Sequence, residues 1–142
     1  MPNFRDAAQR HWDDAEYLLG NQRLPNADQL YGLSAECALK AIMQAAGELL
    51  LLENGKPEEQ DMRRHIDKIW EVFLSFSNNR TLTHYAEALE NKSNSFKDNK
   101  WSIAQRYEDG SKITPEIVRQ HKEAASSTIK LLLKAELDGL LS

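Results

Sequence analysis

The chain has 142 residues, enough for one domain, and 41% of them are hydrophobic, as in a folded globular protein. Its 18 lysines and arginines against 22 aspartates and glutamates give a net charge of −4, which argues against a protein that coats duplex DNA by neutralising phosphates. The longest unbroken apolar run, Leu49 to Leu52, is too short for a membrane-spanning helix. Because Cys37 is the single cysteine and no signal peptide is expected, we expect no internal disulfide and a location in the cytoplasm.

Apolar side chains that recur at helical spacing predict the first two helices. The first is expected over about residues 3–19, ended by Gly20 and Asn21. Asn26 with Gln29 three residues later resembles a capping box, so the second helix is expected over about residues 27–53. Its many alanines would let a neighbouring helix approach closely.

Two further helices and a polar segment are expected in the middle of the chain. Large apolar side chains predict a third helix over about residues 58–76, and a short fourth helix is expected to begin at Thr81. The polar residues 91–99 predict a loop, and Trp101 follows them as an aromatic anchor.

The last helix has the clearest start, because Thr114 can cap it and Pro115 suits its first position. Its apolar face continues to Leu140, and no segment of the chain alternates with period two. The sequence therefore predicts an all-α fold, an antiparallel up-and-down bundle of four main helices plus a short extra helix, in one domain over residues 1–142. The apolar stripes are wide for one such bundle, and a homodimer is therefore expected.

Four histidines are candidates for acid–base or metal chemistry, but they lie on four different predicted helices and lack the spacing of a zinc-binding helix. They are His11, His65, His84 and His121. We therefore expect no metal and no cofactor. His121 lies near the apolar stripe of the last helix, where it is either a buried, hydrogen-bonded residue or a ligand contact.

Two pairs of residues combine an arginine with a ring. Arg80 and His84 can share one helix face, where a guanidinium would bind phosphate and an imidazole would activate a ribose hydroxyl; a solvated helix start is the alternative. Arg106 offers a fork for phosphate, and Tyr107 offers a face on which a base can stack. The alternative is that Trp101 and Tyr107 pin the loop to the bundle, while Arg106 pairs with a carboxylate such as Glu36.

Two features of the second helix have ordinary explanations. Glu36 and Lys40 stand four residues apart, the spacing of a helix-stabilising ion pair. Cys37, inside an alanine-rich stretch, is expected to be buried and not to act as a nucleophile.

Four segments together resemble the HEPN domain, a small helical bundle named for its occurrence in higher eukaryotes and prokaryotes and for nucleotide binding. They are His11-x3-Ala15-x2-Leu18-Leu19 on the first helix, residues 34–41 on the second, residues 101–107 before the last helix, and residues 129–133 on the last helix. The resemblance covers nearly the whole chain.

The resemblance implies a dimer of bundles with a polar groove. Many family members are metal-independent ribonucleases, often toxins beside a nucleotidyltransferase antitoxin, that use an arginine and a histidine with four to six residues between them. Others lack this motif and bind nucleotides or substrates for nucleotidyltransferases. After Arg106 the corresponding positions hold Ser111, Lys112 and Ile113.

The function expected from this resemblance is a nucleotide- or RNA-binding module, partner of a nucleotidyltransferase or toxin–antitoxin type system. Its site is expected around Arg106 and Tyr107, with Arg80, His84 and His121 contributing from adjacent helices. The alternative is a metal-independent, toxin-like ribonuclease that uses Arg80 and His84 as a displaced pair.

Overall fold

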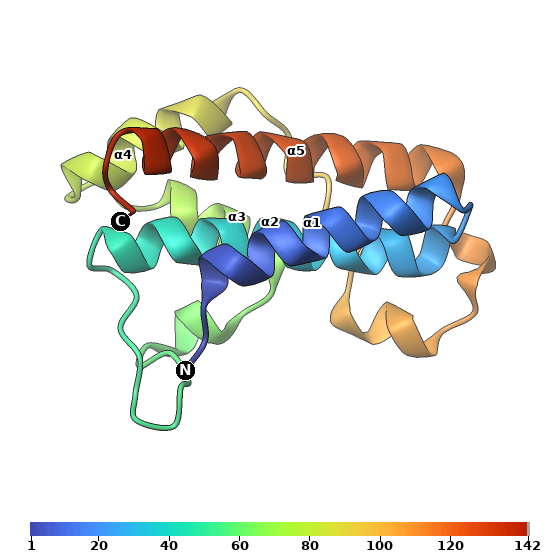
Figure 1. The fold of residues 1–142 in the computed structure, drawn as a ribbon, viewed down its shortest axis with the longest axis horizontal. Helices are drawn as coiled ribbons and strands as arrows, with labels where there is room; N and C mark the ends of the chain where they lie inside the picture. Colours follow the sequence, from blue (N-terminus) through green and yellow to red (C-terminus); the bar gives the residue numbers. More distant parts are fainter. Residues whose placement is uncertain (142) are drawn as a thin grey trace.

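Five α-helices and three short 3₁₀ helices form the fold in the computed structural model, which describes residues 1–141 (Figure 1). The α-helices are α1 (Phe4–Gly20), α2 (Leu24–Ala45), α3 (Ile66–Leu74), α4 (Arg80–Glu90) and α5 (Pro115–Leu137). The 3₁₀ helices are η1 (Gln60–Arg63), η2 (Ile103–Tyr107) and η3 (Gly110–Lys112). Over the described residues the one strand-like pairing is an isolated bridge between Leu51 and Pro57, so the all-α prediction is confirmed.

The long helix α2 lies at the centre of the bundle, since 14 of its 22 residues are buried. After a short turn α2 runs back along α1, and α5 lies lengthwise beside them (Figure 1). The small residues on α2 allow the close approach that the sequence predicts. Ser34 donates a hydrogen bond of 2.8 Å to the carbonyl oxygen of Ala8 on α1, which requires the two backbones to lie near each other.

The bundle has three long and two short helices, instead of four main helices and one extra. The helix predicted over residues 58–76 is divided, because Arg64 and His65 adopt extended backbone between η1 and α3. Trp70 on α3 is fully buried within this single chain, so its size does not require a second copy.

The predicted bounds of α2 are wrong at both ends. The helix begins at Leu24 with Pro25 in its first turn, and Arg23 at the N-cap makes no side-chain bond, so Asn26 does not form the expected capping box. The helix ends at Ala45, followed by Gly47 in the left-handed region with φ of 86°.

The residues after α2 form a turn instead of two more helical turns. The backbone N–H of Leu52 donates to the carbonyl oxygen of Lys56 at 2.8 Å, and that of Glu58 donates to Leu50 at 2.8 Å. Gly55, with φ of 84°, turns the chain between these contacts. Residues 50–52 therefore pair with residues 56–58 as extended backbone.

Side-chain caps set the starts of α1, α4 and α5. Asn3 accepts from the N–H of Asp6, and Asn79 accepts from that of Leu82. Thr114 accepts from the N–H of Ile117 at 3.3 Å, which confirms the predicted start of α5. None of the helices over residues 1–141 is long and apolar enough to cross a membrane.

Candidate functional site

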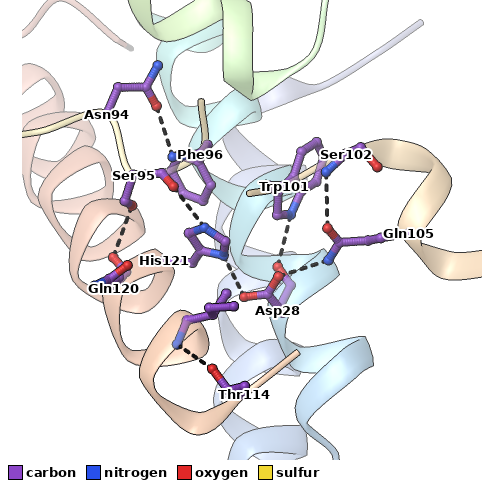
Figure 2. Close-up of polar contacts among 11 residues, drawn as sticks. Asp28, Asn94, Ser95, Phe96, Trp101, Ser102, Gln105, Thr114, Gln120 and His121 are labelled. Carbon is purple, nitrogen blue, oxygen red and sulfur yellow. Dashed lines mark hydrogen bonds and ion pairs between the residues drawn. The ribbon is translucent and has the colours of Figure 1, made fainter. Parts of the chain in front are cut away.

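A buried polar network joins α2, α5 and the long connection between α4 and α5 (Figure 2). At its centre, Oδ1 of Asp28 lies 2.6 Å from Nδ1 of His121, and both side chains are fully buried. Nε2 of His121 lies 3.0 Å from the carbonyl oxygen of Ser95. Oδ2 of Asp28 accepts a hydrogen bond of 2.8 Å from Gln105 on η2. Asp28 thus holds the connection at two points, directly at Gln105 and through His121 at Ser95.

The hydrogen-bond partners determine how many hydrogens this pair carries. The carbonyl oxygen of Ser95 can only accept, so Nε2 of His121 must carry a hydrogen. Nδ1 faces a carboxylate oxygen, and a second hydrogen lies between Nδ1 and Oδ1 of Asp28. The Phe96 ring stacks on the imidazole with centroids 4.8 Å apart and 21° between the ring planes, which fixes the orientation of the imidazole.

The segment that carries η2 is anchored to α2 by two further features. The indole N–H of Trp101 donates to the carbonyl oxygen of Asp28 at 3.1 Å, and the ring packs where Gly32 has no side chain. Ser102 and Gln105 form a reciprocal capping box at the start of η2. The prediction that Trp101 anchors this connection is confirmed, since its side chain is buried.

Arg106 and Tyr107 lie exposed at the end of this anchored segment and form what we call the Arg106/Tyr107 surface. The guanidinium carbon of Arg106 lies 4.8 Å from the centroid of the Tyr107 ring. Tyr107 is 80% exposed, so it does not pin the loop to the bundle. Over residues 1–141, Arg106 takes part in no ion pair. With Arg23 it lines a cavity of about 300 Å³. The other lining residues are Pro25, Asn26, Gln105, Glu108 and Gly110.

The other three predicted site residues, Arg80, His84 and His121, do not lie at the Arg106/Tyr107 surface. Arg80 and His84 are exposed on α4, which lies at the opposite end of the bundle from the orange segment that holds η2 (Figure 1). The His84 ring instead meets the neighbouring Tyr85 ring edge-on at 5.1 Å. His121 is fully buried and hydrogen-bonded, which is the first of the two predicted alternatives. A ligand at the protein surface therefore does not reach its ring.

Glu36 pairs with other residues than Arg106. Its two carboxylate oxygens lie 3.0 Å from Nζ of Lys40 and 3.0 Å from Nδ1 of His65. The predicted Glu36 and Lys40 pair is therefore confirmed. The hydrogen bond that His65 donates to Glu36 raises the pKa of His65 above its usual value, against a smaller opposing effect of burial.

Cys37 is partly buried, and burial raises the pKa of its thiol to about 12. The thiol is therefore protonated near neutral pH, whereas the nucleophilic form of a cysteine is the thiolate.

The burial of Asp28 and Gln29 and the anchoring role of the half-buried Gln105 were not predicted from the sequence. The burial of Asp28 could have been predicted, because Asp28 stands seven residues before the buried Ala35 and therefore lies on the same face of α2. Gln29 is 6% exposed, and neither its amide nitrogen nor its oxygen has a hydrogen-bond partner. Nothing local marked Gln105, whose partner lies 77 residues away.

No protein-family model, curated protein or solved structure matches this chain. Among residues 1–141, no group of three or more His, Cys, Asp or Glu side chains is placed to hold a metal ion.

Proposed function

We propose that this chain is a nucleotide- or RNA-binding helical module that holds its ligand at the Arg106/Tyr107 surface. The observation that carries the proposal is an exposed tyrosine and an arginine free of carboxylate partners, side by side on a segment anchored by Trp101 and Gln105. Tyrosine is enriched at interfaces, because its ring offers a large apolar contact area while its hydroxyl stays hydrated.

The chemistry of this surface suits a nucleotide. A base can stack on the free face of Tyr107, a contact that contributes about 1–3 kcal/mol in nucleic-acid-binding proteins. Arg106 and Arg23, which line the same cavity, can share a phosphate through charge-assisted hydrogen bonds. Because the buried Asp28 network holds η2 in place, little conformational entropy is lost when the ligand binds.

The resemblance to HEPN domains extends the proposal to partners. A nucleotidyltransferase of a toxin–antitoxin type system would be the second protein, and a homodimer is the expected form of this chain. Exposed Leu133 and Leu137 on α5 offer apolar surface for such an association.

The binding proposal is tested by titrating a fluorescently labelled single-stranded RNA with the purified protein and following anisotropy. Arg106→Ala should weaken binding about tenfold to a hundredfold, the loss of a charge-assisted bond, with an unchanged melting temperature because Arg106 has no ion pair to lose. Arg64→Ala is the matched control, since Arg64 is an exposed arginine paired only with Asp61. Equal binding by wild type and Arg106→Ala would refute the assignment.

The ribonuclease alternative rests on Arg80 and His84, which stand one turn apart and exposed on α4. Incubation with structured RNA in the presence of a chelator separates it from the binding proposal. Cleavage that persists with chelator and is lost in both Arg80→Ala and His84→Ala would establish the nuclease instead.

A further inference from the structure

A wide cavity lies away from the Arg106/Tyr107 surface, between α5 and the connection that follows α4. It has a volume of about 960 Å³, within the range of small-molecule sites. Its walls come from residues 90–100 on one side, from α5 on the other and from Trp70 of α3 at its base. We call it the α5 groove.

The connection that forms one wall of the α5 groove is fixed to α5 by buried and hydrogen-bonded residues. The Phe96 side chain is fully buried against His121, whose Nε2 donates to the carbonyl oxygen of Ser95. Ser95 in turn donates through its hydroxyl to the carbonyl oxygen of Gln120 on α5 at 3.2 Å. Asn94, 6% exposed, accepts from the N–H of Phe96 at 3.1 Å (Figure 2). The wall is therefore organised before any ligand arrives.

This wall carries three lysines, Lys92, Lys97 and Lys100, which are exposed and take part in no ion pair over residues 1–141. Asp98 and Asn99 both adopt left-handed backbone, with φ of 61° and 62°, a conformation that costs energy for residues other than glycine. This turn places Lys97 and Lys100 at either side of its tip, on a chain whose net charge is −4.

Carboxylates also line the groove: Glu90 lies on the same wall as the lysines, and Glu71 and Glu123 come from α3 and α5. Glu90 at the end of α4 has no hydrogen-bond or ion-pair partner over the described residues, and Glu71 on α3 meets only the amide of Asn94, at 3.4 Å. Glu123 on α5 is engaged by Arg119. A continuous phosphate backbone would be repelled by these groups, whereas ribose hydroxyls and base amino groups can donate to them.

We propose that the α5 groove is a second binding site, specific for a nucleoside phosphate, either free or at the end of an RNA strand. Lys97 and Lys100 bind the phosphate, and Glu90 accepts hydrogen bonds from the nucleoside. This site is separate from the Arg106/Tyr107 surface and would let the protein respond to a small nucleotide while that surface holds another ligand.

The test is calorimetric titration of the full chain with ATP, with inorganic tripolyphosphate and with a single-stranded RNA. The Lys97→Gln/Lys100→Gln variant should bind ATP and tripolyphosphate about tenfold more weakly, since two charge-assisted contacts are lost. Its matched control is Lys56→Gln/Lys68→Gln, which removes the same charge from lysines outside the groove and should bind as wild type does. Glu90→Gln should weaken ATP binding and leave tripolyphosphate binding unchanged.

Each outcome bears on one site. Wild type that binds no ATP, or lysine variants that bind it as wild type does, would overturn the α5 groove proposal. Tighter ATP binding in Glu90→Gln would overturn the proposed contact between Glu90 and the nucleoside, because it would show that the carboxylate only repels the phosphates. If ATP binding is lost in Arg106→Ala and kept in the lysine variant, the groove proposal fails and ATP binds at the Arg106/Tyr107 surface. The reverse pattern supports the groove as a site separate from that surface, which the RNA titration of Arg106→Ala tests independently. RNA that competes with ATP identifies a strand end as the ligand.

Discussion

Replacing Gly32 by alanine tests how tightly the connection between α4 and α5 is held on α2. A Cβ atom at Gly32 would lie under 3.0 Å from three atoms of the Trp101 indole, closer than real Cβ atoms come to a neighbour. The indole cannot move aside easily, because it is 1% exposed, hydrogen-bonded to the carbonyl oxygen of Asp28 and packed edge-on against Phe96. Gly32→Ala must therefore strain the core or expel Trp101.

The two responses set the size of the effect. An aromatic side chain buries about 150–250 Å², so full expulsion at about 25 cal/mol per Å² costs about 4–6 kcal/mol. Strain without expulsion costs about 1–3 kcal/mol. We expect Gly32→Ala to lower the free energy of unfolding by about 3–5 kcal/mol, with weaker RNA binding wherever Trp101 is displaced, because η2 follows it directly.

The assay is urea denaturation followed by far-ultraviolet circular dichroism. Gly20→Ala is the matched control, since a Cβ at Gly20 meets nothing within 4 Å, and a helical alanine should leave stability equal or raise it by up to about 1 kcal/mol. If Gly32→Ala unfolds at the same urea concentration as wild type, Trp101 does not pack against α2 and the anchoring of η2 is wrong.

Three further predictions concern buried or half-buried polar groups. Gln29→Met should raise the free energy of unfolding by about 1–3 kcal/mol, because it removes two buried polar atoms that have no partner; a loss of stability in urea titration would show that they have one. The pKa of His65 is raised in the folded state, so its bond to Glu36 stabilises the protein fully below about pH 6.5 and this contribution is lost as pH rises through the higher folded value. The stability difference between wild type and His65→Ala should therefore shrink with pH, and a difference that grows would contradict the assignment. Asp28→Asn should cost about 3–5 kcal/mol in the same titration, since it leaves the buried His121 without its carboxylate; an unchanged stability would show the pair to be dispensable.

The elements that could be predicted from the sequence depend on local contacts. Thr114 and Pro115 start α5 through groups at most three residues away, and the period of the apolar side chains reports the helix class. The end of α2 could not be predicted in this way. The leucines of residues 49–52 favour helix locally, but the left-handed Gly47 and the pairing with residues 56–58 prevail.

The candidate site shows the same division. The exposure of Arg106 and the anchoring of Trp101 could be inferred from an aromatic residue inside a polar connection. The Asp28 and His121 pair could not, because the two residues are 93 positions apart and only tertiary packing brings them together. Arg80 and His84 are neighbours on α4 as predicted, but their distance from η2 is a property of the whole bundle.

The most direct test of the proposed function is a map of the amide chemical shifts of isotope-labelled protein during titration with single-stranded RNA. We predict that the largest changes fall on residues 23–26 and 105–110, which surround the cavity beside Arg106 and Tyr107, and that Arg106→Ala reaches the same changes only at about tenfold to a hundredfold higher RNA concentration. RNA that binds with its largest changes on α4, around Arg80 and His84, or that leaves every amide shift unchanged, would contradict the account.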